Sequence, residues 1–495
     1  MPFKLKFSNF SIGALNRQNS APAKLNSEKI IRINHNNNNI NNSIVLDFKK
    51  FCKKLEEITN KEESLKGISL NVFHTRVFPV YPELASRIYA LFCRVSGHKG
   101  NGPIAASSFL QVAEKFMNIM SDEKQTELYL KMYAEENLSE IKKDNFQKLA
   151  ILSHTVALDH YPEGPRCCAK TRETLATLAN AAFHGKEVLS LSYLAHWVTE
   201  NSPRLLLGLH RYVVHHLNTS YRTIDQPLSS GPQNEENMDL GTPVLESEPH
   251  FPDNEEAKPL PLSEVWLLAV SLPKLYIQPS VIHSPSSSSG LASLDSQGII
   301  ARFLGTICPS HWTPLYNSNN HGLGANRFLT HVLNYRGPTL TFIRGEGDVE
   351  FCIGSTDEWK ETHMYWGKED CIVLQTKPLF HIIERGPKLM YLNTGIRGYP
   401  LGLRAGLDPR KPTLSINSGF TQVEFKAIPY PLFSVEVWGC GTSQSREAQL
   451  DIKKWQVKQA ERQRQVKLSA ADWVDHPDRY LLELGGRTTY NEQGT

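Results

Sequence analysis

The chain has 495 residues, 40% of them hydrophobic and 21% charged, with 54 Lys and Arg against 51 Asp and Glu. This length exceeds what one hydrophobic core normally serves, so two or three domains are expected. The charge balance excludes a chain-wide basic surface, and we predict no nucleic-acid partner. No stretch approaches the roughly 18 apolar residues of a membrane helix, because Ser271 and Pro273 interrupt the most apolar one, Val265–Leu275.

The cysteines and the N-terminus bear on cellular location. The eight cysteines are scattered, form no CxxC pair and follow no secretory leader, which predicts reduced thiols in a cytoplasmic protein. Pro2 occupies the position where N-myristoylation requires glycine, so no such anchor is expected if Met1 is the true start. Basic residues precede the first acid, Glu28, which leaves a mitochondrial transit peptide as an alternative.

The first half of the chain divides into three segments. Residues 1–45 are rich in Asn, Ser and Lys and predict a disordered tail. Residues 46–220 show helical periodicity, with Leu84, Ile88 and Leu91 on one face, and predict an all-α module. Residues 221–260 are rich in acids, Pro and Gly and predict an extended linker.

Within the helical segment, residues 97–108 resemble a degenerate calcium-binding EF-hand loop. Gly102 and Ile104 stand where the sharp turn and the eighth position would be, but Ser108 replaces the final glutamate. A similar pattern recurs around residues 184–194. We therefore predict an EF-hand-like module that binds no calcium, with unrelated helices joined by a Gly-containing loop as the alternative.

The second half changes to the alternation of β-strands. Leu340 and Phe342 alternate with threonines, and a turn at Gly345–Asp348 leads into the alternating Val349–Ile353, which predicts a β-hairpin. Residues 371–374 and 433–438 predict further strands, the second with Phe433, Val435 and Val437 on one face, and residues 326–333 predict one helix. Two packed sheets, preceded by a helix within residues 265–277, would bury these faces.

An ordered series of landmarks in this half resembles a TLDc domain. It begins with Trp-Thr-Pro-Leu-Tyr-Asn from Trp312 and ends with Val-Glu-Val-Trp-Gly at Gly439. The matching residues, to which we assign structural roles, are Trp312, His321, Gly322, Phe328, Gly337, Asp348, Trp359, Glu436 and Trp438. The helical module and the basic C-terminus resemble the mTOR-associated, EAK-type members more than the short oxidation-resistance type.

This resemblance implies an α+β chain: the EF-hand-like module, a TLDc β-sandwich with flanking helices over residues 261–440, and a C-terminal helix and tail over residues 441–495. It also implies no catalytic activity and no cofactor. The partners it implies are V-ATPase subunits and mTOR signalling components, at the lysosomal surface or in oxidative-stress resistance. The glycine-rich segment of many members is reduced here to residues 398–406, and their myristoylation signal is absent.

Several groups of residues could form reactive sites, and a structural interpretation is favoured for each group. His154, His160, Cys167 and Cys168 match no usual zinc spacing, so no metal site is predicted. Glu346, Asp348 and Glu350 are expected to be solvated at a hairpin tip, and His321 has no evident nucleophile beside it. A thiol-based enzyme of oxidative-stress protection is the alternative function, although Cys352 and Cys371 lie in predicted buried strands.

Residues 445–468 contain no Gly or Pro and predict a long basic helix with Ser445 as its N-cap. Its apolar residues form no continuous stripe, so a solvated helix is one interpretation. The other is a partner-binding helix that docks into an acidic groove. Its binding residues would be Lys453, Lys454, Trp455, Lys458, Arg462, Arg464 and Lys467.

Overall fold

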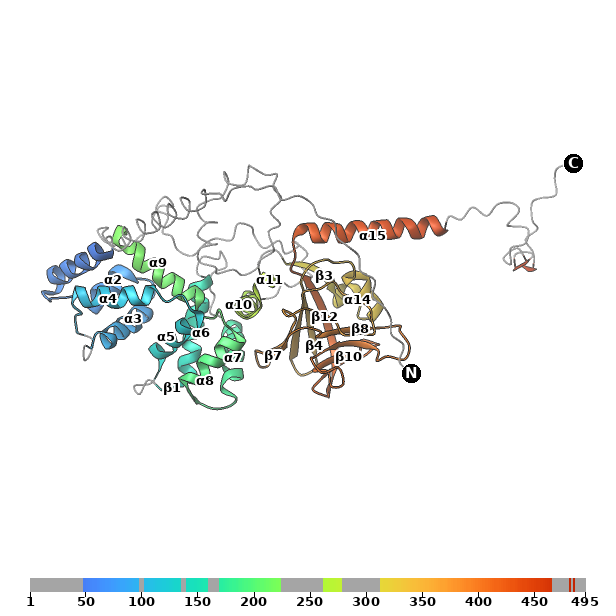
Figure 1. The fold of residues 1–495 in the computed structure, drawn as a ribbon, viewed down its shortest axis with the longest axis horizontal. Helices are drawn as coiled ribbons and strands as arrows, with labels where there is room; N and C mark the ends of the chain where they lie inside the picture. The colour runs from blue at the N-terminus through green and yellow to red at the C-terminus, as the bar shows by residue number, and fades with distance from the viewer. Residues whose placement is uncertain are drawn as a thin grey trace, which may run out of the picture. The chain divides into compact units, whose positions relative to one another are not determined.

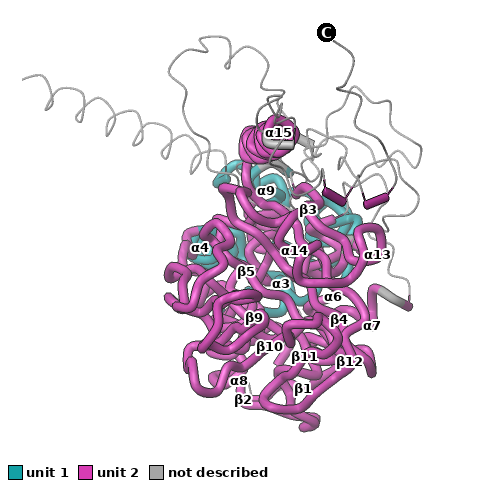
Figure 2. Tube along the Cα trace, turned by 90° about the vertical axis from the view of Figure 1, so that its right-hand side faces the viewer, with its two compact units in different colours: residues 1–117, 215–228 teal, residues 118–214, 229–495 magenta. Residues whose placement is uncertain are grey.

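The computed structural model describes residues 48–97, 102–134, 139–158, 169–223, 261–277, 312–464, 480–481 and 484–485 (Figure 1). The predicted tail at 1–45 and nearly all of the predicted linker at 221–260 lie outside these residues. The chain divides into two compact units, residues 1–117 with 215–228, and residues 118–214 with 229–495 (Figure 2). The division runs through the predicted helical module, so its second part belongs to the same unit as the strands.

The first unit is helical in its described part. Residues 48–63 are helical, followed by α2 (Leu70–Val77), α3 (Pro82–Val95) and α4 (Ala106–Met117). Phe73, Phe92 and Phe109 pack edge to face or tilted in its core. The loop before α2 and the loop between α3 and α4 meet in a backbone bridge. Ile68 and Ile104 exchange hydrogen bonds of 2.7 and 2.9 Å there. The predicted EF-hand-like loop, which contains Ile104, is thus paired with the loop before α2, and this second loop was not predicted from the sequence.

The second unit begins with a similar helical arrangement. Its helices are α5 (Asp122–Tyr133), α6 (Lys143–Leu158), α7 (Ala169–Phe183), α8 (Leu191–Asn201) and the first residues of α9 (Leu207–Thr223). The short strands β1 (Glu140–Lys142) and β2 (Val188–Ser190) pair antiparallel, with Ile141 opposite Leu189. The helix–loop–helix predicted around residues 184–194 is therefore joined to a second one through their loops.

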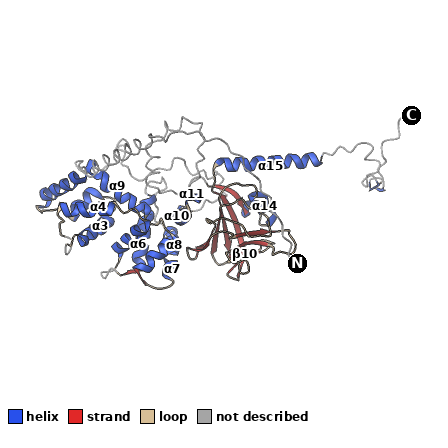
Figure 3. Ribbon diagram, in the orientation of Figure 1, coloured by secondary structure: helices blue, strands red, loops and turns tan. Residues whose placement is uncertain are grey.

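A ten-stranded antiparallel sheet follows among the described residues, and Figure 3 shows it as the strand-rich part of the molecule. Its path runs β7-β6-β5-β4-β12-β11-β10-β9-β8, with β3 added beside β12. The strands are β3 (Thr313–Asn317), β4 (Thr339–Gly345), β5 (Val349–Ser355), β6 (Ile372–Lys377), β7 (His381–Arg385), β8 (Met390–Asn393), β9 (Gly402–Ala405), β10 (Leu414–Ile416), β11 (Gln422–Phe425) and β12 (Ile428–Gly439).

The long strand β12 belongs to both halves of this sheet. Its first residues pair with β11, and its later residues pair with β4 on one side and β3 on the other. Side chains of both halves, such as Phe351 and Val373 from one and Leu403 and Val423 from the other, form one buried core. The predicted pair of separate sheets is therefore one sheet folded over itself, and the sandwich is its two halves.

The predicted alternation of residues 433–438 is wrong at its first position. Val435 and Val437 are buried as expected, but Phe433 is 62% exposed. The register of β12 against β4 shifts between Leu432 and Ser434, which places Phe433 in a β-bulge. The bulge reverses the facing of the residues before it, so Leu432 takes the core position that strict alternation assigned to Phe433.

Short helices cover parts of the sandwich. The helix expected within residues 265–277 is two helices, α10 (Leu262–Ser271) and α11 (Lys274–Ile277), separated at Pro273 because proline cannot continue a helix. The predicted helix at 326–333 is α14 (Ala325–Val332), preceded by the single turn α13 (Ser318–His321). The C-terminal helix α15 (Ser443–Arg464) begins two residues before the predicted N-cap Ser445.

Strand β7 lies at one end of the sheet, where its backbone groups would otherwise be unpaired. The amide of Phe380, just before β7, donates to the Thr177 carbonyl at 3.1 Å, and the amide of Ile382 donates to Asn201 Oδ1 at 2.9 Å. Arg385 and Glu200 form an ion pair at 2.8 Å. Helices α7 and α8 thus cover an edge that is otherwise prone to pair with another chain.

Candidate functional site

The aromatic landmarks of the sequence lie in the core of the sandwich. Phe328 on α14 is fully buried, edge to face against Trp359 at 5.1 Å between ring centroids. The indole of Trp359 donates to Thr339 Oγ1 at 2.8 Å, and that of Trp312 donates to the Tyr276 carbonyl at 2.7 Å. Phe328 and Trp359 therefore pack against each other, and the indole N–H groups of Trp312 and Trp359 each have a hydrogen-bond acceptor. These contacts agree with a structural role.

The remaining landmarks occupy constrained backbone positions or strands. Gly322 has a φ of +82°, which side chains disfavour, and a Cβ on Gly337 would lie 3.2 Å from the Gly441 Cα atom. Asp348 closes the β4–β5 hairpin with a φ of +59°. Trp438 is buried on β12. The two glycines carry no side chain, Trp438 is buried, and Asp348 is exposed at the hairpin tip.

His321 stands between backbone and aromatic neighbours. The amide of Asn317 donates to its Nδ1 at 3.1 Å. Its ring stacks on Tyr316 at 5.8 Å and on His331 at 3.9 Å. Burial lowers the pKa of His321, and the nearby His331 and Lys453 lower it further. The accepted hydrogen bond places the proton of the neutral ring on Nε2.

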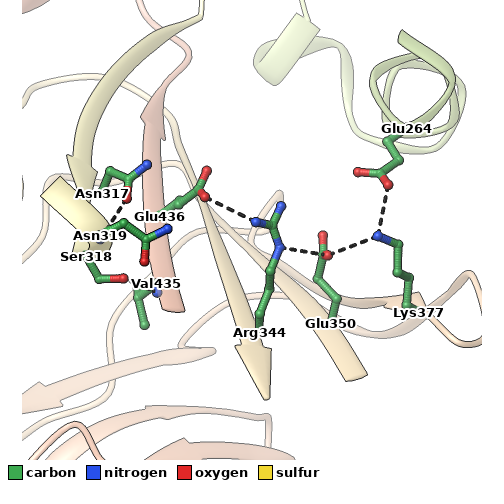
Figure 4. Close-up of polar contacts among 9 residues, drawn as sticks. All are labelled: Glu264, Asn317, Ser318, Asn319, Arg344, Glu350, Lys377, Val435 and Glu436. Atoms are coloured by element: carbon green, nitrogen blue, oxygen red, sulfur yellow. Dashed lines mark hydrogen bonds and ion pairs between the residues drawn. The ribbon is translucent and has the colours of Figure 1, made fainter. Parts of the chain in front are cut away.

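A line of five charged side chains crosses from α10 over four strands, and we call it the charge chain (Figure 4). The oxygens and nitrogens of consecutive members are 3.0, 3.5, 3.0 and 3.2 Å apart. In order, its members are Glu264 on α10, Lys377 on β6, Glu350 on β5, Arg344 on β4 and Glu436 on β12. The charges alternate in sign along the whole line.

The charge chain corrects the expected place of Glu350, whose side chain is only 3% exposed. Sequence spacing put it at a solvated hairpin tip, but the tip is made by the residues between β4 and β5 alone. Glu350 lies within β5 and is held by Arg344 and Lys377. Burial raises the pKa of the Glu436 carboxyl, although Arg344 opposes that rise. Glu436 is thereby a member of an ion-pair line as well as a family landmark.

Three cysteines of the sandwich are buried, as was predicted for two of them, Cys352 and Cys371. Cys352, Cys371 and Cys440 form no disulfide and have no solvent exposure. Burial raises the pKa of the Cys352 and Cys440 thiols well above its ordinary value. A thiolate, the reactive form in peroxide chemistry, is therefore disfavoured at both positions. Among the described residues, no group of three His, Cys, Asp or Glu side chains could hold a metal ion.

Helix α15 is attached to the sandwich near its start. Gln449 is 0% exposed, and its Nε2 donates to the carbonyls of His331 and Leu333 at 2.9 Å each. Lys453 Nζ donates to the same His331 carbonyl at 3.2 Å. These carbonyls lie at the C-terminal end of α14, where helices leave acceptors unpaired and attract positive charge. Gln449 could not be singled out from the sequence, because a glutamine on a polar helix resembles a solvated residue.

The predicted partner-binding residues separate into two groups. Lys453 is half-buried against α14 and is therefore part of the attachment. Lys454, Trp455, Lys458 and Arg462 are exposed, and 61% of Trp455 is accessible. Arg464 is the last residue of α15, and Lys467 lies outside the described residues. No helix in the described part of the chain is long and apolar enough to cross a membrane.

The model of the TLDc domain family matches residues 286–441. This range contains all ten strands of the folded sheet and ends just before α15. The second half of the chain therefore carries a TLDc domain, and the α+β architecture expected from the sequence is confirmed.

Curated relatives share part of the chain, and three of them carry the name "Restriction of telomere capping protein 5". The protein from Leptosphaeria maculans is 22% identical over 259 residues, covering 37% of this chain and 41% of the relative. That from Neurospora crassa is 35% identical over 203 residues, covering 32% and 33%. That from Colletotrichum graminicola is 24% identical over 244 residues, covering 35% and 39%. The matched regions thus span less than half of these relatives.

Proposed function

We propose that this protein is a non-enzymatic adaptor that binds a larger assembly through its TLDc domain and the exposed face of α15. By the resemblance of its sequence to the mTOR-associated TLDc proteins, the assembly is the V-ATPase on the cytoplasmic side of the lysosome. The adaptor would associate there peripherally and act in mTOR signalling or oxidative-stress resistance. Neither a cofactor nor calcium takes part in this proposal.

The exposure of Trp455 on a basic helix carries the proposal. Large aromatic side chains are rarely left in solvent, and tryptophan is enriched among the residues that dominate binding energy. Leu450 and Val457 of the same helix are also exposed, at 40% and 57%. An apolar anchor among exposed lysines suits a groove with an apolar floor and acidic walls.

The thiol enzyme is the weaker alternative because of the burial described above. Peroxide chemistry needs an accessible thiolate, whereas the sandwich encloses its cysteines and raises the pKa of two of them. Incubating the purified protein with hydrogen peroxide and a thiol donor tests this alternative. Catalytic turnover of peroxide would contradict the adaptor proposal.

Affinity recovery of the V-ATPase from cell lysate tests the proposal. We expect the double variant Trp455→Ala, Lys458→Glu to recover at least about tenfold less of the assembly, since hot-spot truncations cost 2 kcal/mol or more. Lys124→Glu, an exposed lysine on α5, is the matched control and should recover as much as the unaltered chain. A chain ending at Gln444 should behave as the double variant does. Undiminished recovery by that truncated chain would remove α15 from the mechanism.

The relatives' name provides a second candidate, a role in restricting telomere capping. It rests on matches of 22–35% identity that cover about a third of this chain. Fractionation of cells that express the tagged chain distinguishes the two candidates. Co-sedimentation with lysosomes favours the adaptor, and recovery with chromatin favours the telomere-related role.

A further inference from the structure

Four basic or titratable side chains meet where α15 joins the sandwich, and we call this group the α15 root: His321, His331, Arg446 and Lys453. They come from α13, α14 and α15. The two imidazole rings stack 3.9 Å apart between centroids. Lys453 Nζ lies 3.2 Å from the His331 carbonyl. The fold thus brings His321 and His331 together with Arg446 and Lys453, which lie more than a hundred residues later in the chain.

The α15 root has no negative charge to balance it among the described residues. None of its four members forms an ion pair with a described carboxylate. A fifth cation, Arg327, donates to the His321 carbonyl at 2.6 Å and adds to the positive charge. Asp451, the acid of α15 that pairs with Lys454 at 3.5 Å, is exposed. Like charges are therefore gathered without compensation.

Three side chains of the α15 root, His321, Arg446 and Lys453, have lowered pKa values. Burial lowers the pKa of Lys453 to about 8, with a further contribution from Arg446. Burial likewise lowers the pKa of Arg446, and the pKa of His321 falls through burial and through His331, Lys453 and Arg446. Partial exclusion of solvent thus disfavours the charged forms of His321, Arg446 and Lys453, and neighbouring groups add to this effect at His321 and Lys453.

The hydrogen bonds within the α15 root leave donors available. His321 Nδ1 accepts from the Asn317 amide, so its Nε2 carries the proton. His331 Nδ1 lies 2.8 Å from the Arg327 carbonyl, which can only accept, so this nitrogen donates and Nε2 gains a proton only when the ring is charged. One nitrogen of Arg446 donates to Gln449 Oε1, which leaves the rest of its guanidinium fork unused.

We propose that the α15 root is a binding site for a phosphate group, taken either from a free phosphate or from the headgroup of a phosphorylated lipid. A dianionic phosphate has several acceptor oxygens and suits an arginine fork, a lysine and imidazole N–H donors together. It would supply the missing negative charge and raise the pKa values of His321, Arg446 and Lys453, which burial lowers. Because it bridges α13, α14 and α15, it would also tighten the attachment of α15. The proposal does not depend on the V-ATPase.

Calorimetric titration of the full chain with inorganic phosphate, at fixed ionic strength with chloride as the replacement anion, tests the proposal. We expect saturable binding with a Kd on the order of 1 mM. Arg446→Gln and Lys453→Met should each weaken it by about tenfold or more, since each removes a charge-assisted hydrogen bond. Lys454→Met and Lys458→Met, on the same helix but outside the α15 root, are the matched controls and should change it less than about twofold.

Two further measurements separate the sources of phosphate and guard against misfolding. Sedimentation with phosphatidylcholine vesicles containing a phosphatidylinositol phosphate should exceed that with phosphatidylcholine alone if the phosphate is a headgroup, and should not if it is free. Histidine NMR should show the pKa of His321 rise on phosphate addition in the unaltered chain and not in folded Lys453→Met. Absence of saturable binding, or equal weakening by Lys454→Met, would overturn the proposal.

Discussion

The charge chain and the α15 root are two groups of ionisable side chains in the same compact unit, and they differ in charge pattern. In the charge chain, each cation lies between two carboxylates, and Glu350 at its centre is almost fully buried. In the α15 root, basic groups neighbour one another, and no described carboxylate pairs with them. Both groups connect a helix to the sandwich, α10 in one case and α15 in the other.

The difference shows how structural and ligand-seeking charges can be told apart. Buried charges are tolerated when opposite partners and hydrogen bonds replace the lost water, as they do around Arg344. Partly exposed cations that repel one another gain little from folding. Such an arrangement is better explained by an anion that binds to the folded protein. We therefore assign the charge chain to stability and the α15 root to binding, and four predictions test this assignment.

The largest effect is expected from Arg344→Met, which removes the cation between Glu350 and Glu436. The two carboxylates would remain largely buried without that partner, at a cost of about 3 kcal/mol in unfolding free energy. Arg336→Met is the matched control, because Arg336 forms an exposed pair with Glu358 at 3.8 Å and should cost less than about 1 kcal/mol. Urea denaturation followed by circular dichroism measures both. Equal losses would mean that the charge chain contributes no more than a surface pair.

A smaller effect is expected from Gln449→Ala, which removes both hydrogen bonds to the carbonyls of α14. The attachment of α15 should weaken by about 1–3 kcal/mol, because the Leu333 carbonyl loses the amide donor and the His331 carbonyl keeps only Lys453. Hydrogen exchange of residues 443–464 should then become faster by about tenfold or more, while the strands stay protected. Gln456→Ala, on the exposed side of the same helix, is the matched control. Unchanged exchange in Gln449→Ala would show that other contacts hold the helix.

The charge chain and the attachment of α15 also show which features of the fold can be predicted from the sequence and which cannot. The β4–β5 hairpin, helix α14 and the buried cysteines followed from local periodicity and turn residues. The bulge at Phe433 did not, because it depends on register against β4, a strand about 90 residues earlier. Glu350 was assigned to solvent because of its position beside a hairpin tip, and no role was predicted for Gln449 on its polar helix. Their partners, Arg344 and Lys377 for one and the end of α14 for the other, become neighbours only through the fold.

A still smaller effect on stability is expected from Lys453→Met in the α15 root. The variant loses one hydrogen bond to the His331 carbonyl but also relieves repulsion with Arg446. The two changes oppose each other, so the unfolding free energy at pH 7 should change by less than about 1 kcal/mol. Urea denaturation measures this beside Lys454→Met. A loss as large as that of Arg344→Met would place Lys453 among the structural charges and remove the distinction between the two groups.

The smallest effect concerns pH. Burial lowers the pKa of His321, and Lys453 and Arg446 of the attached α15 lower it further, so the detached state binds more protons below about pH 6.5, and attachment weakens as the pH falls through that range. The pKa of Lys453 is lowered to about 8, so attachment strengthens again as the pH rises from about 8 towards the ordinary pKa of lysine.

Hydrogen exchange of α15, corrected for the intrinsic pH dependence, should therefore show two rises in protection as the pH increases. Lys453→Met should abolish the alkaline rise and reduce the acidic one without abolishing it, because burial, His331 and Arg446 still lower the pKa of His321. Saturating phosphate should reduce both, since a bound dianion favours the protonated forms that attachment otherwise disfavours. Protection that decreases with rising pH would contradict the repulsion on which the α15 root is defined.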